Sequence, residues 1–386
     1  MAVRRGAGLP LFFLLLGAVG GYGVRSDIFR RLRVRYFPQS VQISKLSAGD
    51  FPAGVAAPTG ESAALPLRPV RIGFVPRGSS AALLLATGKD AEGGLIKSGY
   101  ALDARSVVFS REEDLQLSFS LGTERGGIDF AALGVDRLAQ ASPLLRDAAP
   151  KVLLLLSHSQ GQDALAVAGT SITQLADLRG KRIAVYPKSS AYYFGLWLLS
   201  RAALSVEDVS WFELGSELDA GAALREGKAD AALGLRGDIE LASHDRAGKV
   251  LATTADAPHL VATVLVVRGD FNARYPNAVR RIVRGILDSA IAVNRAPEAS
   301  SRLLGEVAPY LGEPGEAIDS APPSELRENL SFFSLLAEAP VTYGELFESA
   351  AALFVRLKRV APGPRLSAEE TLDLTALKSI PLSGSK

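Results

Sequence analysis

The sequence is poor in the side chains that carry most redox and metal chemistry. Its 386 residues include no cysteine and only three histidines, His158, His244 and His259. Without cysteine the chain has no disulfide, no thiol nucleophile and no acylated lipoprotein cysteine. The histidines are too scattered to predict a clustered metal site. No G-x-S-x-G, H-E-x-x-H or G-x-x-x-x-G-K-[ST] sequence occurs, so we predict no cofactor and no phosphoryl-transfer or redox chemistry.

The net charge of +2 conceals a basic N-terminal segment. Residues 1–35 contain seven arginines and one acidic residue, whereas the rest of the chain contains 36 basic and 40 acidic residues. The basic character belongs to this short segment, so the pI of about 8.7 does not indicate nucleic-acid binding. We therefore predict no nucleic-acid partner.

The N-terminus has the order of features found in export signals. The apolar run Leu9–Val24 follows Arg4 and Arg5 and contains small residues near its end. We interpret residues 1–25 as an export signal or a membrane anchor, and we predict a periplasmic protein, either released or anchored in the inner membrane. Five arginines within residues 25–35 oppose this topology, because positive charge next to an apolar segment favours the cytoplasmic side.

An internal repeat organises the rest of the chain. Residues 71–82 (RIGFVPRGSSAA) and 182–192 (RIAVYPKSSAY) both read as a strand, a proline, a basic residue, two serines and a helix. Further along, residues 128–135 (IDFAALGV) and 229–235 (ADAALGL) form a second matching pair in the same order. Two matches in one order predict two lobes of the same construction, each with strands that alternate with helices.

This organisation predicts an α/β fold with two lobes. We expect two parallel-type sheets flanked by helices, with a ligand cleft between the lobes at the carboxyl ends of the strands. Residues 26–69 are read as a flexible linker because the stretch before residue 70 is rich in Pro, Gly, Ala and Ser. Lobe one is expected to comprise residues 70–165 plus 265–386, and lobe two residues 166–264.

The serine pairs are the strongest candidates for ligand binding. Ser79 with Ser80, and Ser189 with Ser190, each lie between a strand end and a helix start. The free N–H groups of a first helical turn bind carboxylate, sulfonate, nitrate or phosphate oxygens. Helix capping alone explains each serine equally well, so both interpretations stay open.

Several residues near these turns are second candidates. Gly134 begins the turn that follows the repeated D-x-A-A-L-G strand, and Tyr192 could line the pocket from the first turn of its helix. Arg236 is a candidate partner for an acidic ligand, with a surface role as the alternative. Arg77 and Lys188, which directly precede the serines, are interpreted as parts of solvated turns.

The residues leave the chemistry of the ligand open. Asp136 and Asp238 would suit a ligand with an amine, although capping explains both of them. Arg77 and Arg236 would instead suit a plain anion.

The second lobe resembles a known family of binding proteins. The segments DLRGKRIAV (177–185), Ser189–Ser190, LSVEDV (204–209) and ALREGKADA (223–231) are similar to the substrate-binding proteins of nitrate, taurine and aliphatic-sulfonate ABC transporters. That family includes binders of thiamine-precursor pyrimidines. Residues 71–82 and 129–134 of the first lobe carry a weaker likeness.

The resemblance implies a type II periplasmic binding protein that closes two lobes around a small anionic or zwitterionic ligand and delivers it to an ABC permease. It places the binding turns at Ser79, Ser80, Ser189 and Ser190, with Gly134 opposite. Two alternatives stay open. One is an enzyme on the same scaffold, similar to a thiamine-pyrimidine synthase, and the other is a ligand sensor without a transporter.

The leader yields a direct test. We expect residues 1–60, fused to alkaline phosphatase, to give an active enzyme in a bacterial host, because that reporter folds only after export. The phosphatase activity of whole cells measures this. If the phosphatase fusion is inactive and a fusion to a reporter that works only in the cytoplasm is active, the arginines after the apolar run determine the topology.

Overall fold

The computed structural model describes residues 64–88, 94–311, 313–336, 339–360 and 363–381, which all belong to one compact unit. The predicted leader, most of the predicted linker and the end of the C-terminal tail lie outside these residues. No helix within the described ranges is both long enough and apolar enough to cross a membrane.

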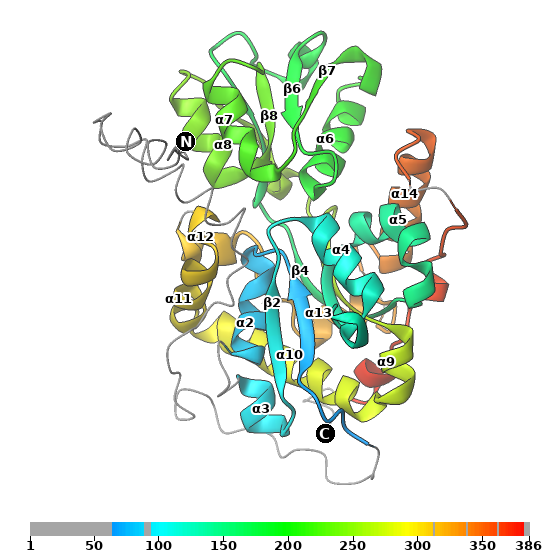
Figure 1. Ribbon diagram of the computed structural model, residues 1–386. Coiled ribbons are helices and arrows are strands. Elements are labelled where there is room, and N and C mark those ends of the chain that lie inside the picture. Colours follow the sequence, from blue (N-terminus) through cyan, green and yellow to red (C-terminus); the bar gives the residue numbers. More distant parts are fainter. Residues whose placement is uncertain (1–63, 89–93, 312, 337–338, 361–362, 382–386) are drawn as a thin grey trace, which may run out of the picture. The chain divides into compact units, whose positions relative to one another are not determined.

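The first sheet contains four strands from the N-terminal part of the chain and one that returns much later. Its strands are β1 (Val70–Phe74), β2 (Ala104–Val108), β3 (Phe130–Gly134), β4 (Lys151–His158) and β10 (Ala262–Val267), in the order β2-β1-β3-β10-β4. With the helices packed around it, this sheet forms lobe one (Figure 1).

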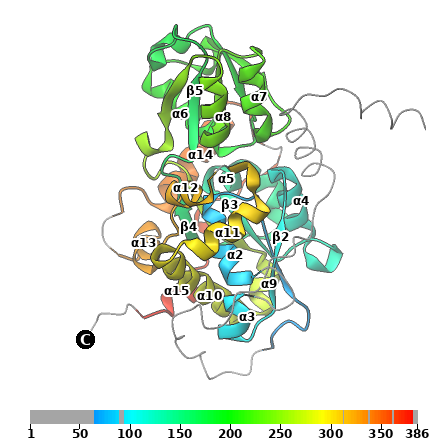
Figure 2. The same cartoon turned by 90° about the vertical axis from the view of Figure 1, so that its left-hand side faces the viewer.

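The second sheet repeats this arrangement. Its strands are β5 (Asp163–Val167), β6 (Arg182–Val185), β7 (Ser210–Glu213), β8 (Ala231–Leu235) and β9 (Lys249–Thr253), in the order β7-β6-β8-β5-β9. The repeated sequence segments form β1 and β6 and also β3 and β8, which hold matching places in the two sheets. The second sheet and its helices form lobe two, drawn in green (Figures 1 and 2). The predicted two-lobed α/β fold is therefore confirmed.

The expectation of parallel sheets is wrong for one strand in each lobe. β10 is antiparallel to β3 and β4, and β5 is antiparallel to β8 and β9. The reason lies in the two crossings of the chain between the lobes. A strand that enters from the other lobe begins at the cleft and runs away from it, whereas its neighbours run toward the cleft. Both sheets are therefore mixed.

Helices cover both sheets. Lobe two contains α6 (Ser190–Arg201), α7 (Ala220–Arg225) and α8 (Arg236–His244). The helices of lobe one are α2 (Ala81–Thr87), α3 (Leu95–Tyr100), α4 (Glu112–Leu121), α5 (Val135–Leu145), α9 (Gly269–Arg274), α10 (Pro276–Arg295), α11 (Glu298–Val307), α12 (Pro314–Asp319), α13 (Leu326–Phe332), α14 (Tyr343–Arg356) and α15 (Thr375–Lys378).

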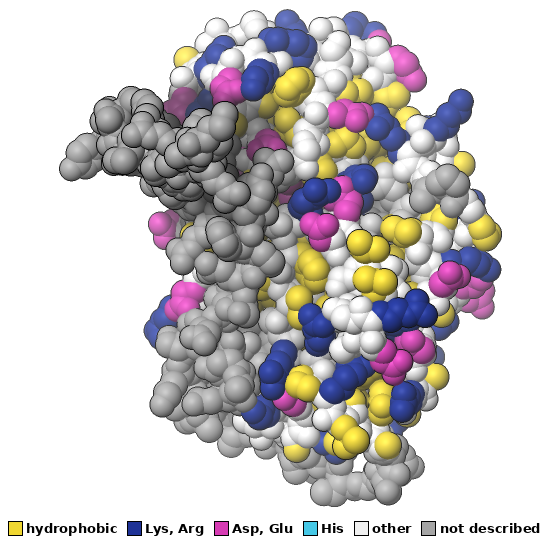
Figure 3. Space-filling view, viewed as in Figure 1, with side chains coloured by type: hydrophobic (Ala, Val, Ile, Leu, Met, Phe, Trp, Pro, Cys, Tyr) yellow, Lys and Arg dark blue, Asp and Glu magenta, His cyan; other side chains and the backbone are white. Residues whose placement is uncertain are grey.

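The two faces of the second sheet differ because side chains alternate along each strand. Alanines such as Ala184 and Ala232 face α7 and α8, and their small size lets these helices approach closely. Larger side chains such as Ile183 and Leu233 face the other way, against α6. α6 approaches so closely that a Cβ at Gly195 would lie 2.2 Å from Leu233 Cδ1. The outer surface is mixed in charge, with basic and acidic side chains interspersed over the face in Figure 3.

A buried asparagine fixes the edge strand β4, which leads to the first crossing. Asn329 of α13 is fully buried. Its Oδ1 accepts a hydrogen bond from Leu155 N at 2.7 Å, and its Nδ2 donates to Leu155 O at 3.0 Å. The side chain thus occupies the place of a neighbouring strand and satisfies backbone groups that would otherwise be buried without a partner.

We expect Asn329→Ala to lower the free energy of unfolding by about 2–4 kcal/mol, since two buried backbone groups lose their partner. Denaturation in urea measures this loss. The matched control is Asn294→Ala on α10. It removes an exposed asparagine whose Nδ2 donates to Pro323 O and Glu325 Oε1, so the loss should be about 1 kcal/mol. Equal losses in the two variants would contradict the proposed role of Asn329.

Candidate functional site

A cavity of about 50 Å³ lies where the strand ends of the two lobes meet. Most of the residues that line it have polar or charged side chains. The polar lining includes Arg77, Ser79, Ser80, Glu112 and Arg137 of lobe one, Ser157, Ser159, Gln162 and Asp163 of the first crossing, and Tyr186, Lys188, Ser189, Ser190 and Glu217 of lobe two.

The cavity brings together five of the seven residues predicted from the sequence. Ser79, Ser80, Gly134, Ser189 and Ser190 all line it. These residues come from both lobes, so the two serine turns of the internal repeat face one space.

Tyr192 and Arg236, the other two predicted residues, do not line the cavity. Tyr192 is buried, and its ring packs edge-on against Trp211 at 5.3 Å between ring centroids. The exposed Arg236 bonds Glu240 on the same helix, with 3.1 Å between Nε and Oε2. We therefore remove both residues from the proposed site.

The serines are not equivalent. Ser189 caps α6, because its Oγ accepts a hydrogen bond from Tyr192 N at 3.3 Å. Ser190 Oγ instead donates to Asp136 Oδ1 of α5 at 3.0 Å, which joins the two lobes. Ser80 Oγ accepts from Arg77 N at 3.1 Å within its own turn. Capping thus explains Ser189, and a contact across the cleft involves Ser190.

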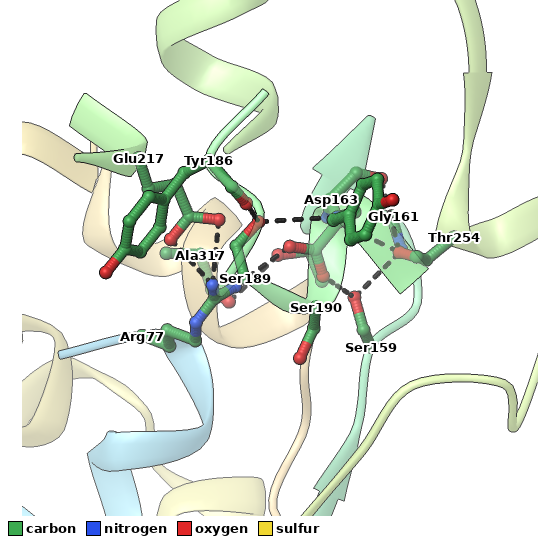
Figure 4. A network of polar contacts seen from close by, with 12 residues as sticks. Arg77, Ser159, Gly161, Asp163, Tyr186, Ser189, Ser190, Glu217, Thr254 and Ala317 are labelled. Carbon is green, nitrogen blue, oxygen red and sulfur yellow. Dashed lines mark hydrogen bonds and ion pairs between the residues drawn. The ribbon is translucent and has the colours of Figure 1, made fainter. Parts of the chain in front are cut away.

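Arg77 is not in the solvated turn that we expected. It lies at the centre of a buried ion network (Figure 4), where Nη1 bonds Asp163 Oδ1 at 2.9 Å and Nη2 bonds Glu217 Oε2 at 2.7 Å. Burial lowers the pKa of Arg77, but the carboxylates of Glu217 and Asp163 raise it above its ordinary value. Because Glu217 begins the short 3-10 helix η8 (Glu217–Asp219) of lobe two, this network closes the cleft.

The same network continues into the two crossing segments. Ser159 Oγ lies 3.0 Å from Asp163 Oδ2 and 2.7 Å from Thr254 Oγ1. Gly161 N donates to Thr254 Oγ1 at 2.9 Å, and the φ of +113° at Gly161 requires glycine. Thr254 follows β9, so this one hydroxyl fastens the second crossing to the first.

A second ion network joins the lobes at the rim. Lys188 Nζ lies 3.0 Å from Glu113 Oε1, and the hydroxyl of Tyr186 also bonds Glu113. Burial raises the pKa of Glu113, but the hydrogen bonds from Tyr186 and Lys188 outweigh this and lower the pKa to about 2. Glu113 therefore stays ionised and holds both side chains of lobe two.

Other polar groups at the cavity remain without a partner. Arg137 Nε, Ser157 Oγ and Gln162 Nε2 are buried and form no hydrogen bond to any residue that the structure describes. The same holds for Oδ2 of Asp136, the residue before Arg137. Buried polar groups of native proteins are nearly always paired, and each exception calls for an explanation. The four atoms therefore lack partners among the described residues, and three of the four residues line the cavity.

Sequence reasoning missed several of these residues. Ser157 and Ser159 both line the cavity, although neither is among the residues predicted from the sequence. Ser157 lies at the end of β4 and Arg137 soon after the end of β3. A search for polar side chains at every predicted strand end, including the ends of apolar strands without a serine pair, would have found both.

Glu112 has an unusual environment for a carboxylate. Burial is the largest cause that raises its pKa. The charges of Asp136 and Glu217 also raise it, those of Arg137 and Arg77 lower it, and the resulting pKa is about 7. Glu112 starts α4 and lines the cavity. Among the described residues, no group of three or more metal-binding side chains could hold a metal ion.

Comparisons with known proteins identify the class of fold. A family model described as NMT1/THI5 like matches residues 126–300. The alkanesulfonate-binding protein SsuA from Xanthomonas axonopodis pv. citri, bound to MOPS, is 19% identical with a TM-score of 0.61, over 80% of this chain and 99% of that one. The aliphatic sulphonate binding protein SsuA from Escherichia coli is 18% identical with a TM-score of 0.63, over 78% of this chain and 96% of that one.

The periplasmic nitrate-binding protein NrtA from Synechocystis PCC 6803 is 14% identical with a TM-score of 0.52, over 81% of this chain and 98% of that one. No curated protein matches the chain. The likenesses establish the two-lobed fold of periplasmic binding proteins. Together with the family model, they confirm the predicted resemblance to the sulfonate- and nitrate-binding family.

The environment of Glu112 predicts a pH dependence of stability. Its pKa rises from 4.5 in the unfolded chain to about 7 in the fold. Below pH 4.5 the protonated carboxyl group of Glu112 therefore contributes up to about 3 kcal/mol to the free energy of unfolding. This contribution is lost as the pH rises to 7. We expect Glu112→Gln to remove this loss, measured as the difference between the urea-unfolding energies of the two proteins at each pH. Asp114→Asn on the same helical turn is the control. Parallel curves of unfolding free energy against pH for the wild type and Glu112→Gln would contradict the prediction.

Proposed function

We propose that this protein is a solute-binding protein of an ABC import system. It captures a small anionic or zwitterionic molecule between its two lobes and delivers it to a permease. The observation that carries the proposal is the polar cavity between the lobes, where Arg137, Ser157 and Gln162 present buried and unpaired polar atoms. A ligand that pairs these atoms removes their desolvation cost and is thereby selected.

The contacts across the cleft support a mechanism of capture by closure. Arg77–Glu217, Lys188–Glu113 and Ser190–Asp136 all join lobe one to lobe two around the cavity. Opening breaks these contacts together and exposes the cavity to solvent. Closure re-forms them and transfers the ligand from water to the polar side chains.

The proposed binding groups belong to both lobes. Ser79 and Ser80 contribute from lobe one, with Gly134 at the end of β3, and Ser189 and Ser190 contribute from the start of α6. The first-turn N–H groups of α6 point away from the helix and suit an anionic group of the ligand. The bond between Ser190 and Asp136 places that helix start beside an acidic side chain as well.

The composition of the cavity favours binding over catalysis. Its described lining offers hydroxyl, amide, carboxylate, guanidinium and ammonium groups, and no imidazole lies among them. Arg77, Glu217 and Lys188 are engaged in ion pairs that join the lobes, which is a structural use of charge. A synthase on the same scaffold stays the alternative, and formation of a product from a bound ligand would identify it.

The location and the partner follow from the same proposal. Several of the similar structures are periplasmic or import-system proteins, and residues 1–25 carry the features of an export signal. We therefore place the protein in the periplasm, where it would meet an ABC permease in the inner membrane. Purification of a permease complex from the native host would test the partner.

A thermal-shift screen of the full chain tests the capture. The compounds are sulfonates, nitrate, phosphate, amino acids and pyrimidines. A true ligand at a hundred times its dissociation constant should add about 2.7 kcal/mol of stability. Replacing Ser189 and Ser190 together by alanine should remove most of this shift. It should also cost about 1 kcal/mol for the lost cap and about 1–3 kcal/mol for Asp136 Oδ1, which loses its partner.

Ser205→Ala is the matched control. Ser205 caps a short helix outside the cavity, so its replacement should cost a similar cap and leave the ligand-induced shift unchanged. A full shift in the Ser189/Ser190 double variant would place binding elsewhere. No shift with any compound would contradict capture of these ligand classes.

A further inference from the structure

The cavity lining includes four basic residues, Arg77, Arg111, Arg137 and Lys188, and three acidic ones, Glu112, Asp163 and Glu217, so the count of charges alone favours neither sign of ligand. Arg77 is shared by two carboxylates, those of Asp163 and Glu217. The guanidinium is therefore already neutralised and is a poor partner for a ligand anion. Arg137 is the other buried cation of the lining. It lies close enough to Asp136 and Glu112 for its charge to act on the pKa of both carboxyl groups. Among the described residues, the charged groups of the lining that form no ion pair are those of Glu112 and Arg137, and these are the charges that a ligand can pair.

Glu112 is the carboxylate best placed to receive that charge. It lines the cavity, and within the described part of the chain no residue forms a side-chain hydrogen bond or ion pair with its carboxylate. Of the two cations near it, Arg77 is engaged with Asp163 and Glu217, whereas Arg137 acts on Glu112 through its charge without forming an ion pair. An unpaired carboxylate that faces an enclosed space gains most from an ammonium group, which supplies both charge and N–H donors.

The same cavity also offers unpaired donors. Arg137 Nε, Ser157 Oγ and Gln162 Nε2 are buried, line the cavity and have no partner among the described residues. These groups donate hydrogen bonds and suit the oxygen atoms of a carboxylate or sulfonate. One cavity thus combines an unpaired anionic acceptor with three unpaired donors.

We infer that the ligand is a small zwitterion, with an ammonium group held by Glu112 and an anionic group held by the donors Arg137, Ser157 and Gln162. This inference rests on the proposed function and makes Glu112 the residue that selects amine-bearing ligands over plain anions. Asp136, whose Oδ2 is unpaired, is a second acceptor beside it.

The assignment makes binding depend on pH. The groups that face Glu112 are Arg137 and Asp136 of α5, Arg77 after β1, and Glu217 of lobe two, and together with burial they set its pKa to about 7. An ammonium binds the ionised form, so its affinity should fall about tenfold for each pH unit below 7. Ligands without an amine should not show this fall.

The experiment compares two zwitterions with their deamino analogues. Taurine is paired with ethanesulfonate, and β-alanine with propionate, in calorimetric titrations of the full chain at pH 8 and pH 6. We expect at least one zwitterion to bind ten times more tightly than its analogue at pH 8, and to lose about tenfold at pH 6. Whether taurine or β-alanine binds more tightly identifies the anionic group as sulfonate or carboxylate.

Glu112→Gln assigns the preference to this side chain. We expect it to abolish the tenfold preference for the amine and the pH dependence, while Asp114→Asn keeps both. Asp114 lies on the same turn of α4, is 55% exposed and does not line the cavity, so the change in charge is matched. If Glu112→Gln does not fold, the wild type is titrated by calorimetry in buffers of different ionisation enthalpy, which measures the protons released on binding. We then expect about half a proton to be released for each zwitterion bound at pH 7.

The outcomes separate this inference from the proposed function. A deamino analogue that binds as tightly as its zwitterion, or a preference that persists in Glu112→Gln, overturns the zwitterion assignment and leaves capture intact. The same holds if neither zwitterion binds while the wider screen finds an amine-free ligand. Failure of every compound in both experiments instead overturns the proposed function.

Discussion

A buried guanidinium shared by two carboxylates holds the cleft together. Arg77 extends from lobe one, Glu217 belongs to lobe two, and Asp163 is the first residue of the strand that enters lobe two. Removing one partner of such a network leaves an uncompensated charge in the interior, which costs several kcal/mol. The position of the lobes and the start of β5 are therefore determined by the same three side chains.

The crossing segments keep this network in register. Thr254 of the second crossing bonds both Ser159 and Gly161 of the first, so the two segments move as one. Behind them the rings of His158 and His259 meet edge-on, 4.7 Å between centroids. Burial lowers the pKa of His158 to about 3, so its ring remains neutral at physiological pH and packs as an apolar group. The two crossing segments are thus joined by hydroxyl hydrogen bonds and by ring packing.

The fold was predictable because its signal is local, and the site was predictable only in part. The repeated strand-serine-helix segments indicated β1 and β6 in matching sheets, and the serine turns indicated the cleft. Arg77 was misread because its partners lie 86 and 140 residues away, beyond any local pattern. Tyr192 was misread because a residue two positions after Ser190 points to the opposite side of a helix, here toward Trp211.

The cavity contains two sets of polar groups, and their division explains how binding and closure are coupled. One set, including Arg77 with Glu217 and Lys188 with Glu113, is paired across the lobes and defines the closed arrangement. The other set, including Arg137 Nε and Ser157 Oγ, has no partner among the described residues and raises the free energy of that arrangement. A ligand that pairs the second set lowers only the energy of the closed state, because the groups are solvated when the cleft is open. Its differential affinity for the two states is then the quantity that drives closure.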